Sequence, residues 1–333
     1  MSAQKLTPIE DRSHVGAARR CAAQMAEVLG FGTDAGGRLA LCVTELATNI
    51  LKHAGTGKIL LRPFARAGEL AIEALALDRG PGITDVAASL RDGHSTAGGM
   101  GTGLGALARA SEAFEVYSQA GSGTAVRLEV WRGRAPMPDV IEYGGVSMPL
   151  AGEAVGGDDW AVQGAGSTRS LLVVDGLGHG PLAAQAARAA LVTFERSAGA
   201  APGALLERCH GALARTRGAA AAAAVVEPGQ GRGTFAGIGN IGARVHAGTL
   251  QQHLISHGGT VGHVVRRIQE FPFDFPVGAL LILYSDGLAS RWSLDDYPAL
   301  ASRHPGLIAG VLYRDRDRGA DDVTVVVLKN RMH

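Results

Sequence analysis

The segment SLLVVDGLGHG, residues 170–180, shows most clearly how the second half of the chain folds. A short apolar run that stops at a glycine-rich turn is typical of a buried strand, and this run ends in a carboxylate, Asp175. The pattern recurs further on, where Asp286 follows one apolar run and Asp321 precedes another. We therefore expect a sheet-rich domain whose strands end in acidic residues.

Strands dominate the prediction for this half. We expect them at residues 159–164, 170–175, 219–227, 234–240, 279–286 and 322–329, with two consecutive helices at 181–197 and 202–216. The alanine run at 219–224 is ambiguous because alanine favours helices, and we assign a strand from its neighbours. Many strands with one helix pair predict two sheets covered by helices.

Four acidic positions stand at the expected strand ends: Asp158, Asp175, Asp286 and Asp321. Asp159 and Asp322 lie next to two of them, and spacing leaves those two choices open. Converging carboxylates repel one another unless cations neutralise them, and hard oxygen ligands select Mg²⁺ or Mn²⁺. Two such ions can clamp a phosphoryl group. A turn or cap role is the alternative for any single aspartate, but four in one setting favour a metal site.

The first half begins with two helical patterns, at residues 13–29, with Ser13 as the expected N-cap, and at 34–53. Strands are expected at 70–78 and 124–131. Helices followed by strands, without strict alternation, predict an α/β sandwich with helices on one face of a sheet. The proline- and glycine-rich stretch at 133–139 is the expected linker. We divide the chain into domains at 1–134 and 150–333, with the linker and the start of the second domain at 135–149.

Glu45, Asn49 and His53 follow one another at intervals of four residues in the second predicted helix. This spacing puts them on one helix face. An asparagine oxygen can bind Mg²⁺ beside phosphates, and a glutamate one turn earlier can deprotonate an attacking hydroxyl. A solvated helix face is the alternative, and His53 receives no catalytic role.

Two glycine motifs favour a nucleotide site. Asp78 ends a strand and is followed by Gly80 and Gly82, so its carboxylate can accept from an adenine amine while the base lies against bare backbone. The run 98–105, GGMGTGLG, leads into a helix, where backbone amides can cradle an anion. It does not follow a strand as a Rossmann turn does, and it lacks the GK[ST] of a P-loop.

Composition excludes several classes of protein. The 333 residues suggest about two domains, and the net charge of +1 disfavours a nucleic-acid binder. The three cysteines form no CxxC pair, which favours free thiols in a reducing cytoplasm. No secretory signal and no membrane span are expected. The stretch 314–318, in which arginines alternate with aspartates, is read as a solvated, self-paired surface.

The motifs ELATN (45–49), DRGPG (78–82) and GTGLG (101–105), with YSQAGSGTAV (117–126), resemble the GHKL ATPase superfamily over residues 10–132. The short chain between Gly82 and Gly101 is most similar to the RsbT-like serine kinases of the anti-sigma type. The resemblance implies that Asn49 binds Mg²⁺, that Glu45 is the general base and that Asp78 reads adenine. The implied ATP site also includes Gly80, Gly82, Gly101, Thr102, Gly103, Leu104, Gly105 and Thr124.

The motifs EAVGGD (153–158), DGLGHG (175–180), GIGN (237–240), SDG (285–287) and DDVT (321–324) resemble the SpoIIE-type branch of the PPM serine/threonine phosphatases, in a short RsbX-like form. The resemblance covers residues 140–329. It implies an αββα sandwich and two Mn²⁺ or Mg²⁺ ions, held by Asp158, Asp175, Asp286 and Asp321 with help from the Gly176 carbonyl. His179 is either a polar neighbour of the site or a structural residue.

Together the two resemblances imply a cytoplasmic regulator of partner switching. Its substrates would be STAS-domain antagonist or stressosome-like proteins, with a sigma factor as a further candidate partner. Two rivals stay open: an ATP-gated partner-binding module that transfers no phosphate, joined to the phosphatase, and a scaffold without enzyme activity. The acidic set disfavours the scaffold.

Overall fold

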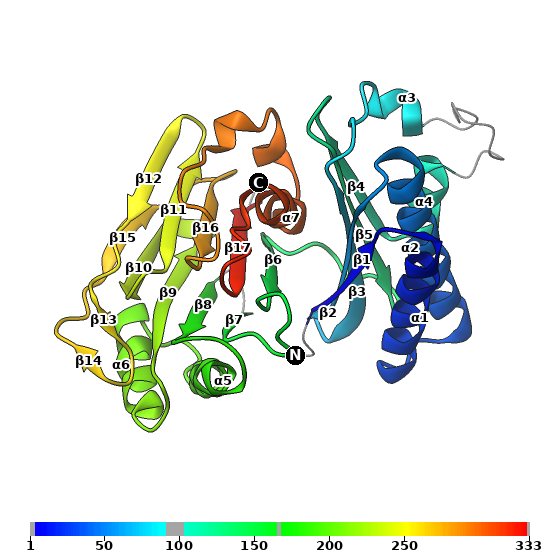
Figure 1. Cartoon of the computed structure of the whole chain (residues 1–333). Helices are drawn as coiled ribbons and strands as arrows, with labels where there is room; N and C mark the ends of the chain where they lie inside the picture. Colours follow the sequence, from blue (N-terminus) through cyan, green and yellow to red (C-terminus); the bar gives the residue numbers. More distant parts are fainter. Residues whose placement is uncertain (1–3, 91–102, 165–167, 332–333) are drawn as a thin grey trace. The chain divides into compact units, whose positions relative to one another are not determined.

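The computed structural model describes residues 4–90, 103–164 and 168–331. The chain divides into two compact units, Met1–Met137 and Pro138–His333, and each is an α/β sandwich, which confirms the expected fold class (Figure 1). No helix in the described ranges has both the length and the apolar character needed to cross a bilayer.

The first unit is one five-stranded sheet with helices on one face. Its elements are β1 (Lys5–Ile9), α1 (Arg12–Val28), α2 (Thr33–His53), β2 (Gly57–Arg66), β3 (Glu69–Asp78), α3 (Val86–Leu90), α4 (Leu104–Ala110), β4 (Ala113–Ser118) and β5 (Thr124–Trp131). The strand order is β1-β2-β3-β5-β4, and all neighbours are antiparallel. Leu39, Val43 and Leu46 of α2 are buried against this sheet with the alanines of α1, so the opposite side of α2 is left for polar residues.

The first helix begins one residue before the expected position. Asp11, not Ser13, is its N-cap, because the Asp11 carboxylate accepts hydrogen bonds from the amides of Ser13 and His14. Aspartate and serine are both common N-cap residues, so residue type alone does not distinguish Asp11 from Ser13.

Buried charges in the first unit are fully paired on strands β2, β3 and β5. Glu73 is 0% exposed, and it accepts from Arg62 at 3.1 Å and from Arg127 at 2.6 Å. Arg127 also pairs with Glu129. A buried carboxylate is tolerated when such partners surround it, so this network is part of the sheet rather than of a reactive site.

The second unit is built from two five-stranded sheets and three α-helices. Its elements are β6 (Ile141–Met148), β7 (Asp158–Gln163), β8 (Arg169–Gly176), α5 (Pro181–Glu195), α6 (Pro202–Leu213), β9 (Ala219–Glu227), β10 (Arg232–Ile238), β11 (Gly242–Ala247), β12 (Leu250–Leu254), β13 (Gly259–Thr260), β14 (Val264–Val265), β15 (Phe271–Asp274), β16 (Leu280–Tyr284), α7 (Pro305–Arg316) and β17 (Val323–Asn330). Short 3₁₀ turns lie at Pro228–Gln230, Leu294–Asp296 and Leu300–Ser302.

The two sheets pack face to face in the order helices, sheet, sheet, helix. One sheet has the order β15-β10-β9-β8-β7 and the other β12-β11-β16-β17-β6. Side chains such as Leu171, Val173 and Leu281 fill the core between them. Helices α5 and α6 contact the first sheet, and α7 contacts β6 and β17 of the second. The result is the expected αββα sandwich.

The alanine run at 219–224 lies in the middle strand, β9, of the first sheet. Its small side chains are buried on both faces, under the helices and between the sheets. The strand assignment is therefore confirmed, and packing outweighs the helical preference of alanine.

The reading of residues 314–318 as a solvated surface is wrong for its first member. Arg314 lies in α7, is only 7% exposed, and pairs with Asp315 at 2.8 Å. Helix α7 is buried along most of its length. A helix that is buried on all sides has apolar residues around its whole circumference, so its sequence does not alternate between an apolar and a polar face.

Candidate active sites

The first site lies on the polar side of α2. Glu45 and Asn49 are both half-buried there, and their side chains hydrogen-bond to each other. Burial raises the pKa of Glu45, although the Asn49 hydrogen bond and the Lys52 charge oppose the shift. A carboxylate with a raised pKa accepts a proton more readily, so Glu45 has the character that a general base needs.

Asp78, at the end of β3, faces the same region. Its Oδ1 accepts from the Gly80 amide at 2.8 Å and from the Thr124 amide at 3.2 Å. The Asp78 charge also acts on His53, whose pKa burial and Lys52 nevertheless lower. The helix-face residues and the strand-end aspartate, which are far apart in sequence, are thus brought together.

The glycines after Asp78 are needed for close packing. A Cβ on Gly80 would stand 2.6 Å from the Cβ of Ala54, at the end of α2. Gly82 has a φ of +74°, and a Cβ there would stand 2.3 Å from the Gln119 carbonyl oxygen. Larger residues would force this loop away from α2 and from the β4–β5 turn.

The last glycine motif is described only in part. Gly103 precedes α4, Leu104 begins it, and Gly105 is buried within it. Gly101 and Thr102 lie outside the described residues. Thr124 is 9% exposed, and its hydroxyl lies 2.9 Å from that of Ser118, so it belongs to the wall next to Asp78.

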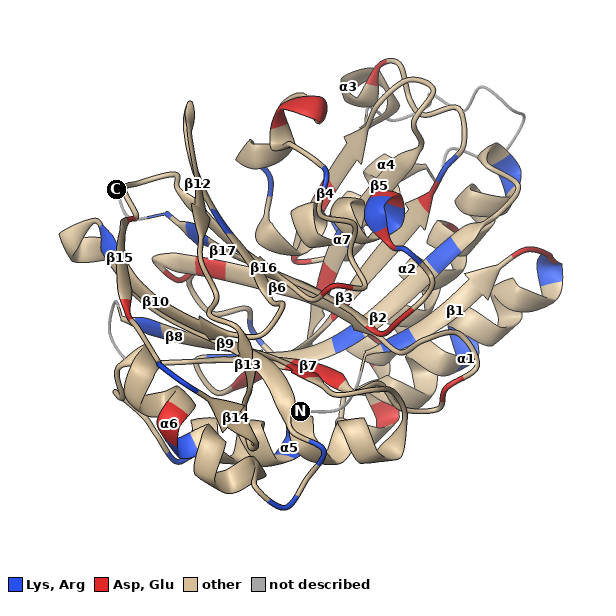
Figure 2. Ribbon diagram, turned by 60° about the vertical axis from the view of Figure 1, so that its left-hand side comes forward, with Lys and Arg blue, Asp and Glu red and all other residues tan. Residues whose placement is uncertain are grey.

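The second site begins where β7 meets β8. Asp158 pairs directly with Asp175 in the antiparallel register, so both side chains leave the same face of the sheet. Trp160 lies two residues after Asp158, and Val173 lies two residues before Asp175. Both belong to the core between the sheets, so the two aspartates leave the face that packs against the second sheet. Asp159 leaves the opposite face, toward the helices. Figure 2 shows the acidic start of β7 in red.

The second sheet brings two more carboxylates to this edge. Asp286 follows β16 and Asp321 closely precedes β17, and these strands are antiparallel neighbours. Ser285 and Thr324 are joined by two hydrogen bonds between them, of 2.9 and 3.0 Å. In an antiparallel pair, the end of one strand lies beside the start of the other, so Asp286 and Asp321 lie at the same edge of the second sheet. The charges of both act on Asp175.

The carboxylates of this edge act on one another electrostatically. The pKa of Asp175 is raised to about 7, by burial first and then by the charges of Asp286, Asp321 and Asp322. The pKa of Asp158 is raised well above its ordinary value, by burial and then by the charge of Asp175. Oδ2 of Asp158 is buried and has no hydrogen-bond partner among the described residues. A buried oxygen without a partner, in an acidic cluster, fits a divalent cation.

The carboxylates gather without forming a closed ligand set. Within residues 4–90, 103–164 and 168–331, no three His, Cys, Asp or Glu side chains are grouped closely enough to hold a metal ion. Oδ2 of Asp286 instead accepts from the Asn240 amide at 2.7 Å. Gly176 ends β8, and its amide donates to the Gly157 carbonyl at 3.0 Å.

Asp321 and Asp322 have different surroundings. Asp322 is 2% exposed, and its two oxygens accept from the amides of Leu150 and Gly157, at 2.6 and 2.5 Å. Asp321 is exposed to solvent. Asp322 therefore anchors the loop before β7, and Asp321 keeps its carboxylate at the surface of the cluster.

Comparison with known proteins matches each unit to a family. Residues 9–130 match the model "Histidine kinase-like ATPase domain", and residues 166–331 match "Stage II sporulation protein E (SpoIIE)". "Serine/threonine-protein kinase RsbT" of Bacillus subtilis (strain 168) is 37% identical over 131 residues, which are 39% of this chain and 98% of the relative. The chain belongs to the RsbT family of histidine kinase-like ATPases, joined to a SpoIIE phosphatase domain. It is an enzyme of the PPM serine/threonine phosphatase class.

Two solved structures share their fold with part of this chain. One, described as "The bacterial stressosome: a modular system that has been adapted to control secondary messenger signaling", has a TM-score of 0.53 and 28% identity, and the match covers 57% of this chain and 99% of that one. The other, "Crystal structure of RsbX in complex with magnesium in space group P1", has a TM-score of 0.50 and 20% identity, covering 59% and 98%. The second likeness concerns the fold alone.

Sequence reasoning missed some residues around the SpoIIE-type site. Asn240 belongs to the GIGN motif but was assigned no role, although its side-chain amide donates a hydrogen bond to the Asp286 carboxylate. Glu153 was also quoted without a role, and its Oε1 lies 2.6 Å from Nδ1 of His179, which favours the reading of His179 as a polar neighbour of the site. The motifs themselves were the available signal, but only contacts between distant segments give these residues a role.

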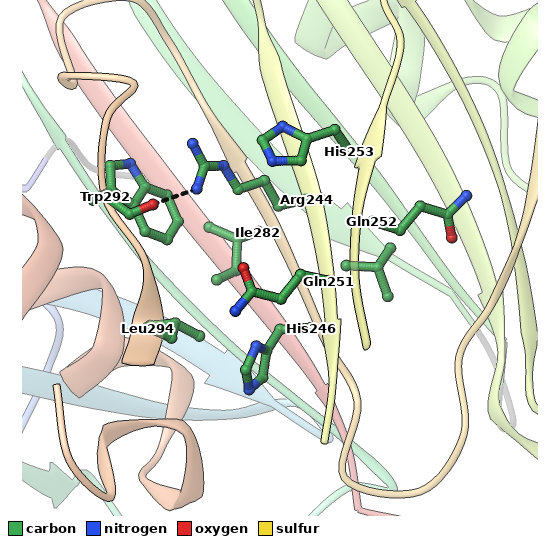
Figure 3. Close-up of a pocket in the computed structure, with 9 residues that line it drawn as sticks. Arg244, His246, Gln251, Gln252, His253, Ile282, Trp292 and Leu294 are labelled. Carbon is green, nitrogen blue, oxygen red and sulfur yellow. Dashed lines mark hydrogen bonds between the residues drawn. The ribbon is translucent and has the colours of Figure 1, made fainter. Parts of the chain in front are cut away.

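A pocket on the outer side of β11, β12 and β16 contains none of the expected site residues (Figure 3). Arg244 donates to the carbonyls of Trp292, at 2.5 Å, and Ser290, and its guanidinium lies 4.2 Å from the centre of the Trp292 ring. His246 and His253 also line the pocket. With Arg244 bonded in this way, the pocket is a structural feature of the sheet and lies apart from the acidic cluster.

Proposed function

We propose that the chain is a regulator of partner-switching type with two opposed activities. The SpoIIE-type unit removes phosphate from phosphoserine or phosphothreonine on a protein, and the RsbT-like unit uses Mg-ATP to phosphorylate serine or threonine on a STAS-domain protein. The observation that carries the phosphatase half is the placement of Asp175, which pairs with Asp158 across β7 and β8 and lies within reach of the charges of Asp286 and Asp321 from the second sheet.

In the phosphatase site, Asp158, Asp175, Asp286 and Asp321 would hold two Mn²⁺ or Mg²⁺ ions, with the Gly176 carbonyl assisting. The partnerless Oδ2 of Asp158 supports this. When bound, the ions supply Lewis-acid stabilisation of the phosphoryl group. The chain's own residues orient the ligands: Asn240 holds the Asp286 side chain, and Asp322 fixes the loop that leads into Asp158.

In the ATP site, Asn49 would bind Mg²⁺, Asp78 would accept from the adenine amine, and Glu45 would take the proton of the substrate hydroxyl. The raised pKa of Glu45 supports the last role. Similarity to RsbT over nearly the whole length of that kinase supports serine/threonine kinase activity. The two activities avoid a futile cycle only if they act on different proteins or under different conditions.

Two assays on the purified full chain test these halves separately. Hydrolysis of p-nitrophenyl phosphate and of a phosphoserine STAS protein is expected with Mn²⁺ or Mg²⁺ and is expected to stop with EDTA. Labelled ATP is expected to transfer its γ-phosphate to an unphosphorylated STAS protein. Measurable ATP binding without any phosphate transfer would contradict the kinase activity and would support an ATP-gated module that only binds its partner.

A further inference from the structure

Arg318, next to the chain that carries Asp286, differs from the other arginines of its segment. Within the stretch 314–318, Arg314 pairs with Asp315, and Arg316 bonds to the Tyr297 hydroxyl at 2.9 Å and lies 3.5 Å from Asp296. The exposed Arg318 makes no ion pair with any residue that the structure describes. The first two guanidiniums are thus committed to the fold, whereas Arg318 is not.

Arg318 is nevertheless held in place. Its Nη1 donates to the backbone carbonyl of Asp286 at 3.1 Å, and its own amide donates to the Gly287 carbonyl at 3.0 Å. The amide of Ala289 donates to the Arg316 carbonyl at 2.8 Å, so the whole segment runs along the chain after β16. The guanidinium therefore lies beside the residue whose carboxylate belongs to the cluster.

A guanidinium has five N–H donors, and the described contacts use one of those on Arg318. Its side chain donates to the backbone carbonyl of Asp286, and no ion pair within the described part of the chain compensates its charge. The planar fork of arginine matches the oxygens of a phosphate monoester and binds them in a bidentate way. A fixed, charged group with free donors at the edge of a phosphatase site is suited to the incoming phosphate.

We propose that Arg318 binds the phosphoryl oxygens of the phosphoserine or phosphothreonine substrate and so determines affinity for the phosphate group. This inference rests on the phosphatase function proposed above. Hydrolysis breaks the bond from phosphorus to the serine oxygen, forms one from phosphorus to a water oxygen, and returns a proton to the serine oxygen. Arg318 stays protonated throughout and provides orientation and charge.

The test uses the full chain and two readouts. The first is steady-state hydrolysis of p-nitrophenyl phosphate with Mn²⁺, with inorganic phosphate as competitive inhibitor. The second is calorimetric titration with inorganic phosphate in Mg²⁺, which needs no turnover. Loss of a charged bidentate contact in Arg318→Ala is expected to raise KM and the phosphate inhibition constant together by about tenfold or more, with kcat changed less than about threefold. Arg318→Lys keeps the charge but not the fork, and should recover part of the loss.

Arg217 gives a matched control. It is exposed, its Nη1 lies 3.0 Å from where a Cβ of Gly178 would stand, and it makes no ion pair within the described part of the chain. Arg217→Ala removes the same charge near the DGLGHG turn without touching Asp286. We expect its KM to change less than about twofold, as for a general electrostatic effect on an exposed site.

The outcomes separate this inference from the proposed function. Metal-dependent hydrolysis with unchanged KM and phosphate binding in Arg318→Ala would overturn the role of Arg318 and leave the phosphatase intact. A larger effect in Arg217→Ala than in Arg318→Ala would overturn it as well. If the wild-type chain hydrolyses nothing, the phosphatase function fails, and the calorimetric comparison still decides whether Arg318 binds phosphate.

Discussion

Glu73 in the first unit and Asp175 in the second are buried carboxylates in opposite surroundings. Burial alone would raise the pKa of Glu73, but the charges of Arg62 and Arg127 outweigh it and hold the pKa below its ordinary value. Asp175 has other carboxylates around it, and its pKa rises to about 7. A buried charge that is paired belongs to the fold, and one that faces like charges marks a place where an external cation or proton is needed.

The largest expected effect is on catalysis at the repelling cluster. Asp175→Asn and Asp286→Asn each remove a proposed ligand, and we expect hydrolysis of p-nitrophenyl phosphate with Mn²⁺ to fall by about a thousandfold, as loss of several kcal/mol of metal stabilisation implies. Circular dichroism should show that both variants are folded. Normal turnover in both folded variants would contradict the metal site. Asp159→Asn, on the opposite sheet face, is the control and should retain activity.

The paired carboxylate should matter for stability instead. Glu73→Gln leaves two buried guanidiniums without their common partner, and we expect the first unit to lose about 3 kcal/mol of unfolding free energy. In urea denaturation of the full chain, the first transition should then have its midpoint at a lower urea concentration. Glu69→Gln, at the partly exposed start of the same strand, should change it little. A Glu73→Gln variant as stable as wild type would remove the distinction between the two carboxylates.

The ATP site should be separable from the phosphatase site. Asn49→Ala removes the proposed Mg²⁺ ligand, and we expect Mg-ATP affinity to fall by about tenfold or more, since even the loss of a residue that only hydrogen-bonds to a metal ligand costs that much. Calorimetry measures the affinity, and Thr48→Ala, on the exposed side of α2, is the control. Hydrolysis of p-nitrophenyl phosphate should be unchanged. Loss of both functions in Asn49→Ala would show that the two sites are not independent.

The smallest expected effect is on the pH dependence of stability without divalent ions. The folded pKa of Asp175, about 7, lies above its ordinary value of 3.8. Its contribution to stability is therefore fully present below pH 4 and is lost as the pH rises through 7. Asp175→Asn should melt like wild type below pH 4 and several degrees higher at pH 8 in EDTA, because the loss of stability runs over the whole interval between the two pKa values. An equal difference at both pH values would contradict the crowding of carboxylates.

Sequence predicted correctly that Glu45 and Asn49 lie on one helix face, because that pattern is local. Glu45 and Asn49 are one turn apart on a single helix, so spacing alone put them on one face. The strand ending in Asp78 was predicted from its alternation. The position of Asp78 beside α2 depends on Gly80, which has no side chain and therefore packs closely against Ala54. The local sequence pattern does not predict this contact between the strand and the helix.

The second site was predicted as a set of residues but not as a geometry. Its aspartates come from strands separated by up to 163 positions between Asp158 and Asp321, and only sheet pairing brings them together. The choice of Asp158 over Asp159 was left open by spacing, whereas the β7–β8 register distinguishes their faces. Helix α7 and strand β6 were not predicted, because α7 is apolar on most sides and β6 stands where glycines indicated a linker.

The alternation of faces along β7 makes the site sensitive to the length of the chain before it. Adding or deleting one residue between the Asp322-bound amide of Gly157 and the start of β7 would exchange Asp158 and Asp159 between the two faces of the sheet. The composition would be almost unchanged, yet the oxygen that faces the cluster would be turned under the helices. Length variation in this domain should therefore be confined to places such as the connection after Gln163, where an inserted residue shifts no carboxylate.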